Sequence, residues 1–138
     1  MKLMSDKVFL DTNILVYSYS NTEPAKQNIA RNLILAHNSV ISTQVLQELC
    51  NVITKKFKLS FEKARLVITE CSLNNELHIN QDSTILLACS IAEKYSFSFY
   101  DSLIVASALE SKSIILFSED LQDGQLIEQT LTIKNPFI

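Results

Sequence analysis

The fold of this chain is limited most by a short apolar run that stops abruptly at polar residues, Val8-Phe9-Leu10 followed by Asp11-Thr12-Asn13. The β-branched and aromatic side chains predict a short strand buried on both faces. In an open α/β sheet, ligands bind beyond the carboxyl ends of the strands, so Asp11 is placed to meet a ligand, most plausibly a cation. An acid after a strand also commonly forms a turn or caps a helix, and that interpretation stays open here.

The composition favours one helix-rich domain spanning residues 1–138, because the chain has a single glycine and two prolines. No apolar run approaches the ~18 residues that span a bilayer, and Asp6 and Lys7 interrupt any signal-peptide core. Cys50, Cys71 and Cys89 lie far apart among apolar residues. We expect them to be buried free thiols of a cytoplasmic protein rather than a disulfide or zinc site. With a formal net charge of −3, a polyanion would have to be held locally, by metal ions or a small basic patch.

Helical and strand-like patterns alternate along the chain, which predicts a parallel sheet. The strand at 8–10, a helix at 25–36 and a strand at 39–42 form a βαβ unit, whose crossover should be right-handed. Residues 14–17 continue the apolar character, 18–22 read as a polar loop, and Thr43 is expected to cap the following helix. The remaining predicted helices are 44–57, about 60–71, 82–91 and 99–109, and the remaining strands are 77–79, 113–117 and 131–133.

Three further acids are candidates for the same site as Asp11, one at the end of a predicted strand and two on predicted helices. Glu48 flanks the apolar stripe of the helix at 44–57, and Asp120 follows the strand at 113–117. Asp101 lies in the first turn of the helix at 99–109, on the same face as its apolar residues. Taken singly, Glu48 suits a helix surface, and an acid in a first turn is favoured by the helix dipole. A carboxylate over a buried face nevertheless needs a partner or a metal.

Together these stretches resemble the PIN-domain ribonucleases, and most closely the VapC-type toxins of bacterial toxin–antitoxin modules. The resemblance covers nearly the whole chain and implies a three-layer α/β/α fold around a parallel sheet of strand order 3-2-1-4-5. The blocks that carry it are Leu10-Asp11-Thr12-Asn13, Gln47-Glu48-Leu49, Tyr100 to Ala108 and Leu116 to Leu121.

The resemblance also implies a site. Its supporting polar residues would be Thr12 or Asn13 together with Ser118. Asp123 is the second choice for the fourth acid, after Asp120. Where the family often has glycine before the fourth strand, this chain reads Ser111-Lys112-Ser113. The catalytic and metal-binding acids that match the family pattern are Asp11, Glu48, Asp101 and Asp120.

Such a set of acids suits phosphodiester hydrolysis. Clustered carboxylates hold Mg²⁺ or Mn²⁺, which orients water and stabilises the leaving oxygen, and oxygen-only ligands favour these hard cations over zinc. The family resemblance adds an RNA substrate, a small antitoxin partner and a homodimer. The basic run at Lys55, Lys56 and Lys58 either contacts RNA phosphates or is a solvated helix end.

Other classes fit less well. A haloacid-dehalogenase-like phosphatase needs a second aspartate two residues after Asp11, where this chain has Asn13. A receiver domain needs an aspartate after the third strand, and residues 77–80 contain none. A non-catalytic protein of the PIN fold, or an RNA interaction module, remains an open alternative.

Overall fold

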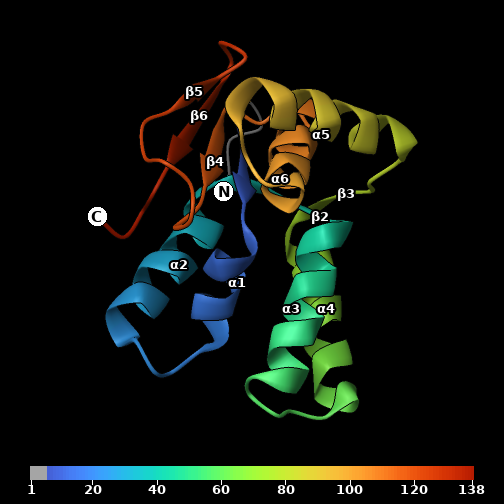
Figure 1. Cartoon of the computed structure of the whole chain (residues 1–138). Coiled ribbons are helices and arrows are strands. Elements are labelled where there is room, and N and C mark those ends of the chain that lie inside the picture. The colour runs from blue at the N-terminus through green and yellow to red at the C-terminus, as the bar shows by residue number, and fades with distance from the viewer. Residues whose placement is uncertain (1–5) are drawn as a thin grey trace.

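The computed structural model describes residues 6–138, which form a six-stranded sheet flanked by helices (Figure 1). None of the helices in this range is long and apolar enough to cross a membrane. The strands are β1 (Lys7–Leu10), β2 (Asn38–Ser42), β3 (Glu76–His78), β4 (Ile115–Phe117), β5 (Leu126–Ile127) and β6 (Leu131–Lys134). The helices are α1 (Thr12–Tyr19), α2 (Pro24–Ala36), α3 (Thr43–Lys55), α4 (Phe61–Asn74), α5 (Asp82–Tyr95) and α6 (Phe99–Glu110).

The strand order is β3-β2-β1-β4-β6-β5. The first five strands in this order pair in parallel, with Phe9 of β1 between Val40 of β2 and Leu116 of β4. This matches the expected order 3-2-1-4-5, with β6 as the fifth strand. The sheet differs from the prediction by β5, a two-residue strand that adds antiparallel to β6 at the edge. The turn before it contains the chain's single glycine, Gly124, at φ +85°.

The direction of the chain crossovers decides which face each helix covers. The connections from β1 to β2 and from β2 to β3 step in one direction, and the connection from β3 to β4 steps back past both. Right-handed crossovers therefore place α1–α4 on one face and α5–α6 on the other. The packing agrees, because α1 contacts α2 and α3, while α5 packs along α6. The crevice between β1 and β4 is the topological switch point, where ligands bind in such sheets.

Helix α6 packs more deeply than the other helices. All residues from Ser102 to Ala108 are buried, and four of these seven are alanine or serine: Ser102, Ala106, Ser107 and Ala108. Small side chains let a helix approach the sheet closely. The central strands beneath carry fully buried side chains, including Phe9, Ile41 and Leu116.

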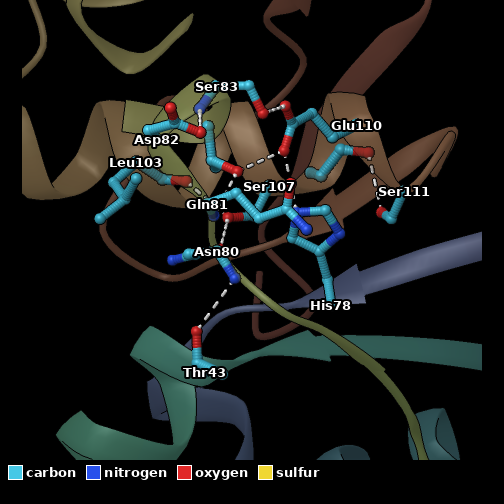
Figure 2. Close-up of polar contacts among 12 residues, drawn as sticks. Thr43, His78, Asn80, Gln81, Asp82, Ser83, Leu103, Ser107, Glu110 and Ser111 are labelled. Atoms are coloured by element: carbon cyan, nitrogen blue, oxygen red, sulfur yellow. Dashed lines mark hydrogen bonds and ion pairs between the residues drawn. The ribbon is translucent and has the colours of Figure 1, made fainter. Parts of the chain in front are cut away.

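Polar contacts fix the carboxyl-terminal half of α6 (Figure 2). Glu110 accepts a hydrogen bond from Thr84 Oγ1 of α5 at 2.5 Å and lies 2.9 Å from His78 Nε2 at the end of β3. Ser107 Oγ donates to Asn80 Oδ1 at 2.8 Å. These bonds tie α6 to β3, to α5 and to the loop between them.

Helix α1 was not predicted. The prediction of an apolar continuation at 14–17 and a polar loop at 18–22 is wrong, because α1 covers Thr12–Tyr19. The segment is rich in β-branched and aromatic residues, which do not favour a helix, and it has no one-sided pattern. No residue of this helix is exposed, and the apolar residues Val16 and Tyr17 lie outside the side that carries its buried positions, so the apolar residues show no one-sided pattern. The N-cap of α3 also differs: Ser42 Oγ accepts from Val45 N at 3.3 Å, whereas Thr43 was expected to cap and is instead the first helical residue.

In the turn between α6 and β4, where the family often has glycine, this chain places Lys112 in a backbone conformation that favours glycine. Lys112 has φ +62°, in the left-handed region that favours glycine. An ordinary side chain there costs roughly 1 kcal/mol. Lys112 N donates to the Leu109 carbonyl oxygen at 3.0 Å, which closes the helix end.

The three cysteines are free thiols, as expected, but only Cys71 is buried. Cys50 is partly buried, and Cys89 is exposed on α5, so the prediction of burial is wrong for Cys89. The apolar neighbours of Cys89 in sequence misled the prediction, because Ile85 and Leu86 are themselves exposed.

Candidate active site

The four predicted acids line one pocket. Asp11 follows β1 and Asp120 lies three residues after β4, so both are at the carboxyl ends of adjacent strands. Asp11 N donates to the Phe117 carbonyl oxygen at 3.0 Å, which extends the pairing of these strands into the site. Glu48 of α3 and Asp101 of α6 line the same pocket, whose volume is about 440 Å³.

Asp11 is the most deeply buried of the acids, with 7% of its surface exposed. Its two oxygens accept hydrogen bonds from Thr12 N at 2.7 Å and Ser118 Oγ at 2.8 Å. Burial raises the pKa of Asp11 to about 6; those hydrogen bonds oppose the rise, and repulsion by Glu48 and Asp120 adds to it. Asp11 is also the N-cap of α1, so the helix-cap interpretation is confirmed, and it is compatible with a further role in the pocket.

The turn from β1 into α1 supplies partners for two other acids. Thr12 Oγ1 donates to Glu48 Oε1 at 2.5 Å, and Asn13 Nδ2 donates to Asp120 Oδ2 at 3.2 Å. The hydroxyl of Ser118 accepts from Asp120 N at 3.2 Å. All three residues expected to support the acids are therefore in contact with them.

Asp101 stands at the amino-terminal end of α6. Its backbone N–H donates to the capping Ser98 Oγ at 3.2 Å, and its side chain is partly buried against the pocket. Burial raises the pKa of Asp120, and the nearby charges of Asp101 and Glu119 raise it further. The carboxylates therefore repel one another inside this pocket.

The structure separates the two candidates for the fourth acid. Asp120 lines the pocket, whereas Asp123 Oδ1 accepts from Asn135 N at 2.8 Å on an exposed loop. The structure thus brings Asp120 to the other acids and leaves Asp123 outside the pocket.

The three lysines of the basic run occupy different places. Lys56 lines the acidic pocket. Lys55 lines a separate hollow on the outer side of α3. Lys58 is exposed beyond the helix end, with φ +56°. Among the described residues, Lys56 is the one basic side chain that lines the pocket.

Sequence reasoning missed an ion pair beside the site. Lys26 Nζ of α2 donates to Glu119 Oε2 at 2.5 Å, and the Tyr17 hydroxyl donates to Glu119 Oε1 at 2.6 Å. Partial burial tends to raise the pKa of Glu119, but these hydrogen bonds from Lys26 and Tyr17 lower it overall. Glu119 is thus committed to this cluster, next to Asp120. No sequence pattern links residues 26 and 119, so nothing predicted the pair.

The chemistry of the pocket fits Mg²⁺ or Mn²⁺. Its charged ligands are carboxylates, and no histidine or cysteine lines it among residues 6–138. In the same range, no three His, Cys, Asp or Glu side chains are close enough together to form a ready-made metal cage. Mg²⁺ needs no such cage, because it typically binds one or two carboxylates and keeps waters or substrate phosphates as its other ligands. A cation would also relieve the repulsion by Glu48 and Asp120 that adds to the effect of burial on the pKa of Asp11.

A family model agrees with this arrangement. The model described as the PIN domain matches residues 8–122. The chain belongs to the PIN-domain family. The match begins in β1 and ends after Asp120, so it includes Asp11, Glu48, Asp101 and Asp120. No curated protein matches the sequence.

Solved structures of toxins and of toxin–antitoxin complexes share this PIN fold. VapC20 from Mycobacterium tuberculosis, a toxin that cleaves the sarcin–ricin loop, is 16% identical, with a TM-score of 0.65 over 82% of this chain and 91% of that one. VapBC2 from Rickettsia felis, bound to a DNA fragment from its promoter, is 19% identical, with a TM-score of 0.66 over 94% of this chain and 99% of that one. A toxin–antitoxin complex from Klebsiella pneumoniae is 18% identical, with a TM-score of 0.70 over 94% of this chain and 97% of that one.

Proposed function

We propose that this PIN-domain protein is a Mg²⁺- or Mn²⁺-dependent endoribonuclease and the toxin of a toxin–antitoxin module. One observation carries the proposal: the four acids that match the family pattern, from four separate parts of the chain, line a single pocket at the switch point of the sheet, where Glu23 adds a fifth carboxylate. Two supports are independent of that geometry. The family model matches most of the chain, and a protein of the same fold, VapC20, is a toxin that cleaves an RNA loop.

The residues of the chain would act mainly by positioning. A bound cation supplies an activated water and stabilises the leaving oxygen. Asp11 is held in one orientation by Thr12 N and Ser118 Oγ, and Glu48 is held by the Thr12 hydroxyl. Asp120 is likewise held by Asn13 Nδ2, so these three acids are oriented candidates to hold the cation. Lys56 offers the pocket a positive charge for a substrate phosphate.

The same geometry favours direct hydrolysis over attack by the ribose 2′-hydroxyl. Attack by the 2′-hydroxyl is commonly served by histidines acting as general acid and base, and no histidine lines the pocket within residues 6–138. Both described histidines contact other parts of the chain, with His78 bound to Glu110 and His37 against Phe117. We therefore propose products with 5′-phosphate and 3′-hydroxyl ends.

The proposal includes two protein partners. The Rickettsia and Klebsiella structures of the same fold contain toxin–antitoxin pairs, which supports a small antitoxin for this protein. A homodimer is proposed from the family resemblance alone. The test is to co-express the chain with the product of the neighbouring gene and to measure the molar mass of the purified species by light scattering. A monomer that binds no such product contradicts this part of the proposal.

The catalytic proposal is tested by incubating purified protein with single-stranded RNA in Mg²⁺ and in EDTA. We expect cleavage only with Mg²⁺. Each of four single variants should lose at least about a hundredfold in rate, a typical contribution of one charged group to such a site: D11N, E48Q, D101N and D120N. The matched control is Asp123→Asn, an acid outside the pocket, which should cleave normally. Full activity in EDTA or in Asp11→Asn contradicts the proposal, and RNA binding without cleavage favours the non-catalytic alternative.

A further inference from the structure

A second hollow opens beside the acidic pocket, along the outer face of α3. It has a volume of about 290 Å³ and is lined by Gln44, Gln47, Glu48, Asn51 and Tyr100. Three of these residues, Gln44, Glu48 and Tyr100, also line the acidic pocket. A ligand in the hollow would therefore lie directly next to the proposed cleavage site.

Gln44 lies between the two hollows with an unsatisfied acceptor. Its side chain is 4% exposed, and Nε2 donates to the Tyr100 carbonyl oxygen at 3.1 Å, which fixes the orientation of the amide. The Oε1 atom is buried and has no hydrogen-bond partner among the described residues. A buried acceptor without a donor is destabilising, so a ligand N–H group that reaches this oxygen after a small shift of the side chain would form a favourable hydrogen bond.

The polar residues of the hollow repeat at helical spacing. Gln44, Gln47, Glu48 and Asn51 stand at i, i+3, i+4 and i+7, and so share one face of α3. Gln47 and Asn51 are exposed, and within residues 6–138 their carboxamides make no side-chain hydrogen bond. A carboxamide both donates and accepts, which matches the mixed donors and acceptors along the edge of a nucleobase.

Tyr100 supplies an open aromatic face at the side of the hollow. The residue is 65% exposed, and the edge-on ring of Phe99 supports it, with centroids 5.3 Å apart at 72°. Exposed aromatic rings bind unpaired bases by stacking. The carboxylate of Glu48 at the same hollow disfavours a phosphate there, so the charged backbone of a nucleic acid would lie in the metal pocket and near Lys56 instead.

We infer that the hollow of Gln44, Gln47, Asn51 and Tyr100 binds the nucleobase of an unpaired RNA nucleotide next to the cleaved phosphodiester. Tyr100 stacks on the base, and the three carboxamides contact its edge. The inference rests on the proposed ribonuclease function and adds a substrate feature to it: one base beside the cut is bound, so its identity affects cleavage.

The test combines a protein change with removal of single bases from the RNA. Binding of a labelled single-stranded RNA is measured with Mg²⁺ in the Asp11→Asn background, where cleavage is blocked. Adding Tyr100→Ala should weaken binding about 5- to 150-fold, the range of one base–aromatic stack. Tyr100→Phe keeps the ring and should stay within about twofold, as should the exposed control Asn32→Ala.

A set of RNAs, each lacking one base, identifies the contact. At one position, loss of the base should weaken binding as much as Tyr100→Ala does, and Tyr100→Ala should then have no further effect. The inference is overturned if Tyr100→Ala weakens binding equally for every RNA of the set. It is also overturned if Tyr100→Ala changes the molar mass of the protein, which would make this surface an interface between copies.

Failure of the base-site inference can be distinguished from failure of the proposed nuclease function. Cleavage by the wild type without the base-specific coupling leaves the nuclease proposal standing and removes only the base site. Coupling without any cleavage by the wild type shows a nucleobase site on a protein that is not a nuclease.

Discussion

Replacing Asp11 with asparagine should abolish cleavage and yet stabilise the metal-free protein at neutral pH. The pKa of Asp11 is raised from 3.8 to about 6, first by burial. A rise of about two pKa units corresponds to roughly 3 kcal/mol of unfolding free energy lost once the carboxyl is ionised in the folded state. Asparagine has the same shape, can accept from Thr12 N and can still contact the Ser118 hydroxyl. Weakening of these bonds offsets about 1 kcal/mol, which leaves a net gain of ~2 kcal/mol, or roughly 5–10 °C in Tm.

The pH dependence of this gain has a definite sign. Because the folded-state pKa of Asp11 lies above its unfolded value, the folded protein binds more protons between pH 3.8 and about pH 6. The unfolding free energy of the wild type therefore falls as pH rises through that window. The advantage of Asp11→Asn should be small near pH 4, grow across the window and stay constant above about pH 6.

The assay is urea unfolding of both proteins in EDTA at pH values from about 4 to 8. The matched control is Glu93→Gln, an exposed acid on α5, which should follow the wild type. Adding Mg²⁺ at about 100 times its dissociation constant should stabilise the wild type by ~2.7 kcal/mol and Asp11→Asn by less. If Asp11→Asn is instead less stable than the wild type at pH 7, with no pH-dependent difference, Asp11 acts only as the cap of α1 and the reasoning is refuted.

Three further predictions concern neighbouring residues. Ser118→Ala removes the hydroxyl bound to Asp11 and should raise the pKa of that carboxyl further, seen as a shift of the same pH window to higher values. Lys56→Gln should reduce the slope of log affinity for single-stranded RNA against log salt by roughly 0.7, the value for one phosphate contact. The exposed control Lys63→Gln should leave the slope unchanged. If Lys56→Gln and the wild type have equal slopes, Lys56 belongs to a solvated helix end and contacts no phosphate. Lys112→Gly should raise the unfolding free energy by ~1 kcal/mol in urea unfolding, because glycine relieves the left-handed backbone, and a loss of stability would contradict that reasoning.

Most elements of the fold follow from local patterns in the sequence. The buried strands read as β-branched and aromatic runs, and α2 begins at Pro24, where proline suits a first helical turn. Helix α1 and strand β5 did not follow. Apolar residues occur on every side of α1, none of whose residues is exposed, so it lacks a one-sided stripe. Strand β5 has two residues, too few to show alternation. Both are set by their neighbours in the fold rather than by their own sequence.

The candidate site could likewise be predicted from the sequence only in part. Acids at strand ends and in first helical turns are visible in sequence, and the structure gathers Asp11, Glu48, Asp101 and Asp120 at one pocket. The contacts that orient these acids and shift their pKa values cannot be seen in the sequence, because they join distant segments. Lys26 and Glu119 are 93 positions apart, and the free oxygen of Gln44 depends on the carbonyl at the start of α6.

The chemical nature of the RNA ends tests the central claim most directly. If the four acids hold a metal ion that directs water at the phosphodiester, the products carry 5′-phosphate and 3′-hydroxyl groups. A 3′ fragment with a 5′-phosphate is a substrate for RNA ligase and for a 5′-phosphate-dependent exonuclease without prior kinase treatment. We expect both enzymes to act on the products of the wild type, and no products from Asp11→Asn. Products with 5′-hydroxyl and 2′,3′-cyclic phosphate ends would show attack by the ribose 2′-hydroxyl and contradict the account.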